Sequence, residues 1–128
     1  MATDGPIECS VITPEEKVLE ARVSSVVIPA HDGQIGVLKN RAPLLCELGI
    51  GVLRVDSERY YVDGGFAQVL DNRVTILTER AAAAGQIDRA EAAKALSQAE
   101  QMSGTDQRSR DARGKAIARA KVRLKLAK

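Results

Sequence analysis

The chain has 128 residues, of which 45% are hydrophobic, and carries a formal net charge of +2 at pH 7. This length fits one compact domain, or one small domain with an appendage. No apolar run approaches the roughly 18 residues that a membrane-spanning helix requires, so we expect no segment to insert into a bilayer. The N-terminal residues match neither a secretory signal nor a transit peptide, and the cytoplasm is therefore the expected compartment.

Short strand-like segments follow one another over the first eighty residues, with turn signals every eight to twelve residues. Because the chain has no Trp, one Phe and two Tyr, its core must consist of Val, Ile, Leu and Ala. Regular short strands of this kind favour an all-β sandwich or barrel. The expected strands are residues 7–12, 17–19, 22–28, 44–48, 51–55, 60–62 and 73–77.

The stretch 27–45 places two short extended segments on either side of a turn. We expect Pro29 to close the first strand, because proline cannot donate to a sheet ladder. Residues 31–33, His-Asp-Gly, tolerate positive φ or bond their own backbone, which favours a tight turn. Pro43 disfavours a helical conformation for the residue before it, and so begins the next extended segment.

The sequence becomes alanine-rich and helical after residue 80. Two runs carry side chains at intervals of three or four residues, which is the helical period. Gly104 lies between them, where a helix can end, so we expect an antiparallel hairpin. The repeating positions are Ala92, Leu96, Ala99 and Met102 in the first run, and Arg113, Ile117, Ala120, Leu124 and Ala127 in the second.

These patterns together predict an α+β fold: a β-sandwich over residues 1–84, followed by a C-terminal antiparallel two-helix hairpin over residues 85–128. The hairpin has six larger apolar side chains, whose full burial contributes roughly 1.5–3 kcal/mol each. Ordering its backbone costs of order 1–2 kcal/mol per residue. We therefore expect a hairpin that needs a surface to lie on, and that can exchange one surface for another.

Positive charge is concentrated in the second half of the hairpin. Residues 104–128 contain nine Lys and Arg but two Asp, a net charge of +7, whereas the rest of the chain carries −5. An acidic protein surface is the partner that fits such a helix best, and a solvated helix face is the alternative. Nucleic acid and lipid fit less well, because the helix lacks aromatic side chains for base stacking and large apolar anchors for a membrane.

Residues with catalytic chemistry are scarce. His31 is the single histidine, and no Ser or Cys nucleophile is arranged around it, so we expect no catalytic role. Cys9 and Cys46 fall inside strand-like runs and are expected to be reduced, buried hydrophobes rather than metal ligands. No Gly-x-x-x-x-Gly-Lys loop is present, so the chain is not itself an ATPase.

Four blocks of sequence resemble the ε subunit of F-type ATP synthases. Residues 27–45 resemble the family's signature, in which a strand ending in Pro is followed by Gly-x-x-Gly-Val-Leu and then by His-Ala-Pro-Leu. The block Val-Asp-Gly-Gly-Phe-Ala-Gln-Val at 62–69 is similar to the family at the right distance downstream, as are residues 11–15 and 49–54. The main departure is Arg41, which stands where the family usually has His.

This resemblance implies a non-catalytic rotor subunit of a proton-translocating ATP synthase. In the family, the sandwich binds the γ subunit and touches the c subunits of the membrane rotor ring. The C-terminal helices fold against the sandwich or extend along γ, and basic residues of the second helix then meet an acidic segment of β and hold back ATP hydrolysis. The catalytic residues belong to the α and β subunits. The implied location is peripheral, on the cytoplasmic face of the inner or plasma membrane or, alternatively, on a plastid thylakoid membrane.

The resemblance also assigns roles to particular residues. Gln34 would face the rotor ring, Arg41 would face γ, and His31 would contribute to the contact with the ring or with γ. The motif by which some family members bind ATP corresponds to residues 87–92 here, with Asp88 and Arg89 as nucleotide-binding candidates, although Glu91 reverses the charge of the family's Arg. An ATP-sensing module is therefore the alternative function, with ATP as a regulatory ligand, and a nucleic-acid-binding module is the third. The residues expected to bind the acidic surface of the catalytic head are Arg108, Arg113, Lys115, Arg119, Lys121 and Arg123.

Overall fold

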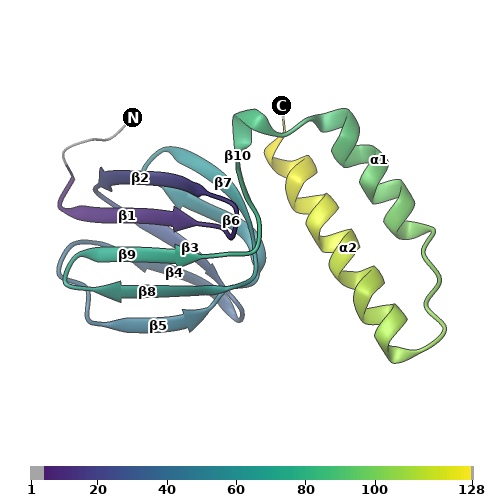
Figure 1. Cartoon of the computed structure of the whole chain (residues 1–128), viewed down its shortest axis with the longest axis horizontal. Coiled ribbons are helices and arrows are strands. Elements are labelled where there is room, and N and C mark those ends of the chain that lie inside the picture. The colour runs from purple at the N-terminus through teal and green to yellow at the C-terminus, as the bar shows by residue number, and fades with distance from the viewer. Residues whose placement is uncertain (1–4, 128) are drawn as a thin grey trace.

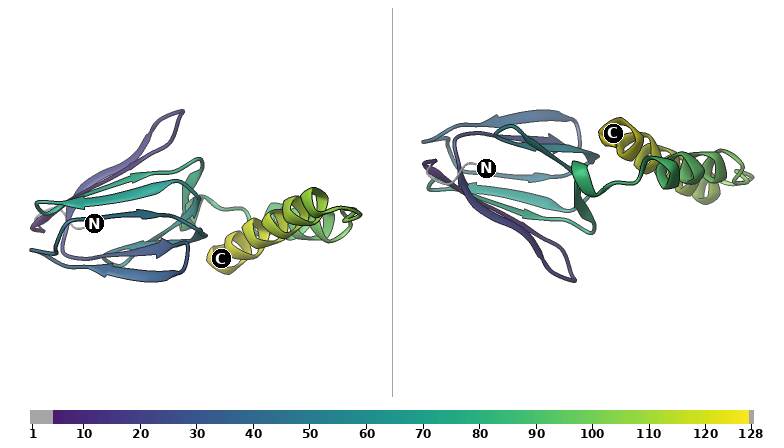
Figure 2. Two further views of the ribbon diagram at one scale, coloured as in Figure 1. Left: turned by 90° about the horizontal axis from the view of Figure 1, so that it is seen from below. Right: turned by 90° about the horizontal axis from the view of Figure 1, so that it is seen from above.

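The computed structural model describes residues 5–127 and consists of a β-sandwich followed by two helices (Figure 1). Ten strands form two five-stranded sheets that lie face to face, and the helices lie beside one end of the sandwich (Figure 2). The predicted α+β architecture, a β-sandwich followed by a helical hairpin, is confirmed.

The first sheet has the strand order β2–β1–β9–β8–β5. Strands β1 and β9 pair in parallel, with Cys9 opposite Val74, whereas the other neighbours in this sheet are antiparallel. Strand β1 therefore lies between β2 and β9 and is not an edge strand. The strands are β1 (Ile7–Ile12), β2 (Lys17–Val23), β5 (Leu44–Glu47), β8 (Phe66–Leu70) and β9 (Arg73–Leu77).

The second sheet has the strand order β10–β7–β6–β3–β4, and all its neighbouring strands are antiparallel. The strands are β3 (Val26–Ala30), β4 (Gly33–Val37), β6 (Ile50–Val55), β7 (Glu58–Asp63) and β10 (Ala81–Ala83). Alternate side chains of the two sheets point inward and form one apolar core, as period-2 strands require. Its fully buried members include Ile7, Val26, Ile28, Leu53, Val62, Val74 and Ile76.

The prediction of one strand over residues 22–28 is wrong, because the chain changes sheets at Ser24 and Ser25. Their backbone N–H groups donate to the carboxylate of Asp56, at 3.0 and 2.9 Å. Asp56 thus satisfies two donors that a continuous strand would have paired with a neighbour. This acceptor is more than thirty residues away in the chain, so no local pattern could reveal it.

Two other strand boundaries also differ from the expectation. Pro29 does not close β3, which continues to Ala30, and the Pro29 carbonyl accepts a hydrogen bond from Gly49 N–H at 2.9 Å. Residues 81–83 belong to the alanine-rich stretch of helical composition but lie within the predicted sandwich boundary, and they form β10 beside β7. Pairing with β7 overrides the intrinsic helix propensity of alanine, which is a weak preference.

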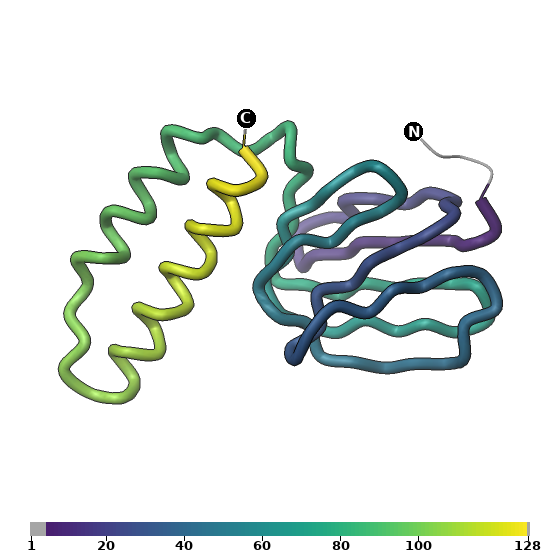
Figure 3. The backbone as a smooth tube through the Cα atoms, turned by 180° about the vertical axis from the view of Figure 1, so that it is seen from behind, coloured from purple at the N-terminus to yellow at the C-terminus, as the bar shows by residue number. Residues whose placement is uncertain are grey.

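The hairpin consists of α1 (Arg89–Glu100) and α2 (Gln107–Leu126), joined to β10 through a short 3₁₀ turn, η1 (Ala84–Gln86). Asp88 and Asp106 cap the two helices, and each side chain accepts a backbone N–H from the third residue after it. Figure 3 shows the helices running antiparallel, so that the end of α2 returns to the start of the hairpin.

The buried face of the hairpin differs in part from the predicted stripes. Met102 is 41% exposed because α1 ends at Glu100, whereas Leu126, which lies on neither stripe, is 1% exposed. Helix α2 lies between α1 and the sandwich and contacts both, so it buries two of its faces. A single stripe of residues at the helical period describes only one buried face, so it misses the second.

Candidate functional site

One end of the sandwich carries the turn between β3 and β4. The antiparallel pairs Ala30–Gly33 and Pro29–Gln34 place His31 and Asp32 at the tip. His31 N–H donates to the Glu47 carbonyl at 2.8 Å, which ties this tip to the end of β5. The side chains of His31 and Gln34 are exposed, so this turn is available to a partner.

Arg41 lies at the opposite end of the sandwich, in the connection that follows β4. The connection is tied to the β8–β9 turn, since Asn40 N–H donates to the Asn72 side chain at 2.6 Å. Arg41 itself is exposed. The structure therefore separates Arg41 from His31 and Gln34 by the length of the sandwich, and one partner surface does not join the three.

The outer face of the first sheet exposes four large apolar side chains, which we call the outer patch: Leu45, Phe66, Leu70 and Leu77. Their exposed fractions run from 44% to 71%. Phe66 and Leu77 are cross-strand partners, and Leu70 borders an open depression of about 410 Å³ that Arg73 and Asp71 also line. A surface of this composition on a small sandwich is typical of a protein–protein contact.

The sequence analysis missed the outer patch, although its signal was present. In a strand with one solvated face, every second residue is polar. Leu44 and Leu45 break this rule as consecutive apolar residues, and in β8 the outward positions include Phe66 and Leu70. When a strand is apolar on both faces, one face packs in the core and the other indicates a contact surface on the outside of the sheet.

Helix α2 docks on β6 and β7 of the second sheet, and an ion pair fixes it there. Nε of Arg119 donates to a carboxylate oxygen of Asp63 at 2.7 Å. The Asp63 side chain is 7% exposed and that of Arg119 is 32% exposed. Tyr61 O–H donates to the same carboxylate oxygen at 3.4 Å, so two donors from different elements converge on Asp63.

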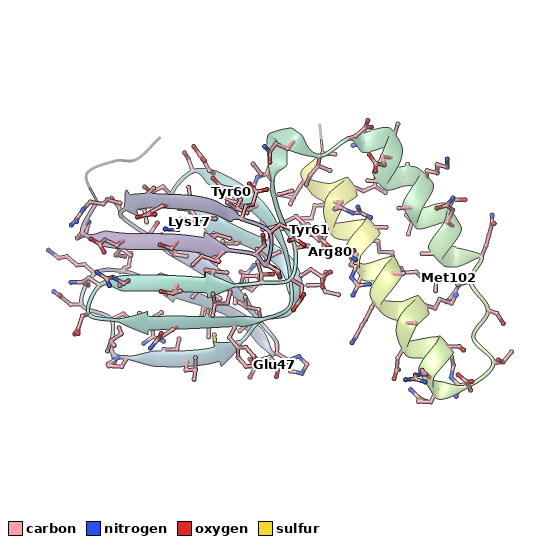
Figure 4. The ribbon with its side chains drawn as sticks, viewed as in Figure 1. Lys17, Glu47, Tyr60, Tyr61, Arg80 and Met102 are labelled. Atoms are coloured by element: carbon pink, nitrogen blue, oxygen red, sulfur yellow. The ribbon has the colours of Figure 1, made fainter. Side chains whose placement is uncertain are left out.

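Tyr61 forms the second contact between α2 and the sandwich. The guanidinium carbon of Arg123 lies 5.9 Å from the centroid of the Tyr61 ring, within range of a cation–π interaction. Burial, together with the nearby Asp63 carboxylate, raises the pKa of Tyr61 to about 12, so the hydroxyl stays protonated and can donate. Figure 4 shows Tyr61 on the side of the sandwich that faces α2.

The six basic residues expected to bind an acidic surface fall into two groups. Arg113, Arg119 and Arg123 are half-buried and engaged within the chain, and Arg113 donates to the Glu100 carbonyl of α1 at 3.0 Å. Arg108, Lys115 and Lys121 are exposed on α2. The docked hairpin thus leaves half of the predicted basic surface open and uses the other half to hold itself in place.

The nucleotide-binding candidates lie at the start of α1. The carboxylate of Asp88 accepts Glu91 N–H at 3.1 Å as the helix cap, and Arg89 is exposed. A small pocket of about 150 Å³ lies beside them. Arg123 of α2 is the positively charged residue that lines it. The Nε atom of Arg123 is buried and meets no hydrogen-bond acceptor among residues 5–127.

The described residues contain neither a cluster of metal ligands nor a membrane-spanning helix. Among residues 5–127, His, Cys, Asp and Glu side chains nowhere gather in the threes that a metal ion needs. Within the same range, neither helix is long and apolar enough to cross a membrane. Cys9 is fully buried in the core, which raises the pKa of its thiol to about 12, while Cys46 is half-buried.

A sandwich with an exposed apolar face, carrying a basic hairpin docked by an ion pair, is typical of proteins that bind other proteins. Residues 6–84 match the family model described as ATP synthase, Delta/Epsilon chain, beta-sandwich domain. The chain therefore belongs to the ATP synthase delta/epsilon family, as its sequence blocks predicted.

Relatives over nearly the whole chain agree with this assignment. The chain is 41% identical to the ATP synthase epsilon chain of Rhodopirellula baltica, over 93% of this chain and 96% of that one. It is also 41% identical to the ATP synthase epsilon chain of Symbiobacterium thermophilum, over 92% and 90%. A chain in the cryo-electron microscopy structure of Euglena gracilis mitochondrial ATP synthase, with OSCP, F1 and c-ring, superposes with a TM-score of 0.80. That match has 26% identity and covers 94% of this chain and 81% of that one.

Proposed function

We propose that the chain is the ε-type central-stalk subunit of a proton-translocating F-type ATP synthase, with no catalytic residue of its own. Its partners would be the γ subunit and the c subunits of the rotor ring and, in the inhibited state, the α and β subunits. Residues 1–84 and 85–128 would act as a binding unit and a regulatory arm. This function implies a peripheral location on the cytoplasmic face of a bacterial membrane or, in a plastid, on the thylakoid membrane.

The outer patch is the observation that carries the rotor role. The docked hairpin contacts β6 and β7 of the second sheet, whereas the outer patch belongs to the first sheet. The patch therefore stays exposed whether the hairpin is docked or released. A permanent partner needs a surface that is available in both states. We assign this surface to γ.

A binding experiment with exposed apolar residues tests this assignment. Leu77→Asp and Phe66→Asp should each prevent co-purification with the γ subunit of the same enzyme, because a charge would be desolvated in an apolar contact. Met102→Asp is the control, since Met102 is 41% exposed but lies between α1 and α2, outside the patch. Retained γ binding by both patch variants would contradict the assignment.

The two ends of the sandwich are proposed to meet different partners. The turn with His31 and Gln34 would contact the polar loops of the rotor ring, and Arg41, at the other end, would lie toward γ. Their separation in the structure fits two partners better than one. Gln34→Lys should weaken assembly with isolated rings while leaving γ binding unchanged, and Arg41→Glu should do the reverse.

The hairpin is proposed to restrain ATP hydrolysis through its basic residues. Arg108, Lys115 and Lys121 are exposed already, and release from the sandwich would add Arg119 and Arg123. Truncation after residue 84 should preserve γ binding, because the sandwich and its outer patch remain, and should raise ATP hydrolysis by the reconstituted enzyme. Unchanged hydrolysis would show that the hairpin does not restrain this enzyme.

Nucleotide sensing is the second candidate function, and the pocket beside Arg123 is the observation that favours it. Arg123 brings a positive charge to the lining of this pocket, which would attract an anion. Against this, Asp88 and Glu91 line the same pocket and would repel phosphate. Calorimetric titration with ATP decides the matter: binding with heat supports sensing, and no heat at millimolar ATP removes it.

A further inference from the structure

The sandwich itself holds the backbone of Asp63, whose carboxylate receives Arg119. Asp63 ends β7, and its backbone N–H donates to Thr78 Oγ1 at 3.1 Å and to the Arg80 carbonyl at 3.1 Å. The Thr78 hydroxyl in turn donates to the Arg80 carbonyl at 3.2 Å, and Thr78 is 4% exposed. None of these groups belongs to the hairpin, so the backbone that carries the acceptor is fixed before α2 docks, and Tyr61 of the same strand donates to the carboxylate.

Arg119 has two competing uses in this chain. It is one of the basic residues that an acidic protein surface would bind, and in the docked hairpin it is already paired with an acidic side chain. An ion pair with one buried partner is sensitive to the loss of either charge, because the remaining charge is left uncompensated. Arg119 cannot bind both carboxylates with the same Nε–H at once.

We propose that Asp63 competes with the acidic surface of the partner for Arg119. Asp63 imitates that surface, and so sets the fraction of hairpins that are free to bind the partner. This inference rests on the proposed restraint of ATP hydrolysis by the hairpin. Docking by the chain's own carboxylate requires no added ligand. The strength of the restraint is then set by a residue of the sandwich that never touches the catalytic head.

Asp63→Asn tests the charge, because the amide keeps the size and one acceptor oxygen. Backbone hydrogen–deuterium exchange over residues 107–126 of the full chain should rise about tenfold, the effect of removing a partly desolvated charge pair. Glu8→Gln is the matched control. It removes the exposed pairs of Glu8 with Arg22 and Arg73 on the first sheet and should leave exchange in α2 unchanged. Unchanged exchange in Asp63→Asn overturns the proposal.

A charge swap separates the ion pair from other effects at this position. Asp63→Arg alone should release the hairpin, and Asp63→Arg combined with Arg119→Asp should restore slow exchange in α2. Circular dichroism of each variant verifies that the sandwich remains folded. Failure of the swap to recover any protection, in a folded protein, overturns the assignment of docking to this pair.

Hydrolysis by the reconstituted enzyme tests the competition. Asp63→Asn should inhibit at about tenfold lower concentration than the unaltered chain, in proportion to the freed hairpin. If truncation after residue 84 raises hydrolysis but Asp63→Asn inhibits no better, the competition is overturned while the proposed function stands. If truncation has no effect either, the proposed restraint of ATP hydrolysis by the hairpin itself fails.

Discussion

Arg123 lies over the ring of Tyr61, with its guanidinium carbon 5.9 Å from the ring centroid, and this stacking joins the last turns of α2 to strand β7. Tyr61 points away from the sandwich core, whose members on β7 are its neighbours Tyr60 and Val62. The contact thus serves the hairpin and not the sandwich.

Two substitutions of Tyr61 separate its ring from its hydroxyl. Tyr61→Leu should loosen the hairpin, because the cation–π contribution of about 0.5–2 kcal/mol is lost together with packing area. Tyr61→Phe keeps the ring and loses only the 3.4 Å bond to Asp63, so its effect should be smaller. The rate of limited proteolysis after Lys121 and Lys125 of α2 measures how far each of the two variants loosens the hairpin. Equal rates for the two variants would contradict a role for the ring.

Gly65 is a position where no other residue fits. Its φ is +99°, and a Cβ atom there would overlap the carbonyl oxygen of Leu77. Gly65→Ala should lower the free energy of unfolding by more than about 3 kcal/mol, since backbone strain of roughly 1–3 kcal/mol and a steric overlap act together. Urea unfolding followed by circular dichroism measures the change.

Gly114 in α2 is the matched control for this substitution. An added Cβ meets no atom within 4 Å there, and the backbone is helical. Gly114→Ala should therefore raise the free energy of unfolding of the hairpin by about 0.5–1 kcal/mol, because alanine has the higher helix propensity. A destabilising effect would show that α2 needs this glycine for a reason other than space.

Alkaline pH should destabilise the sandwich over a defined window. Burial raises the pKa of Cys9 from about 9 to about 12, and the pKa values of Tyr60 and Tyr61 from about 10 to about 12. Above pH 9 the unfolded chain loses these protons first, so the free energy of unfolding falls as pH rises toward 12 and is unaffected below pH 8. For the Cys9 thiol alone, the free energy of unfolding falls by at most about 1.4 kcal/mol per pH unit.

Urea midpoints measured from pH 7 to pH 11 check this window. Cys9→Ala should remove the part of the decline that begins near pH 9, while the part that begins near pH 10 remains with the tyrosines. A decline that begins below pH 8 would have to come from other groups.

The two cysteines should differ in reactivity. Cys9 is fully buried and its thiol pKa is raised to about 12, whereas Cys46 is half-buried with a pKa raised to a lesser degree by burial and Asp32. At pH 8, iodoacetamide should modify Cys46 slowly and leave Cys9 intact until the protein unfolds. Mass spectrometry of tryptic peptides distinguishes the sites, and equal modification in the native protein would contradict the placement of Cys9.

Local patterns were enough to predict much of this protein. Alternating Val, Ile and Leu at strand length predicted the sandwich, and the 3.6-residue period with Asp88 and Gly104 predicted the two helices. The same patterns placed Arg119 and Arg123 in a basic helix. They missed the outer patch, because residues 66–70 were not among the expected strands and the outward positions of Phe66 and Leu70 therefore went unassigned.

The amino-acid sequence alone determined most of the strands, both helices and where positive charge collects, because these properties depend on neighbours within a few residues. Tertiary structure alone decided that β10 is a strand, that the chain changes sheets beside Asp56, and that Arg119 meets Asp63. Each of these depends on a partner many residues away, whose position follows only from the packing of two sheets and a helix.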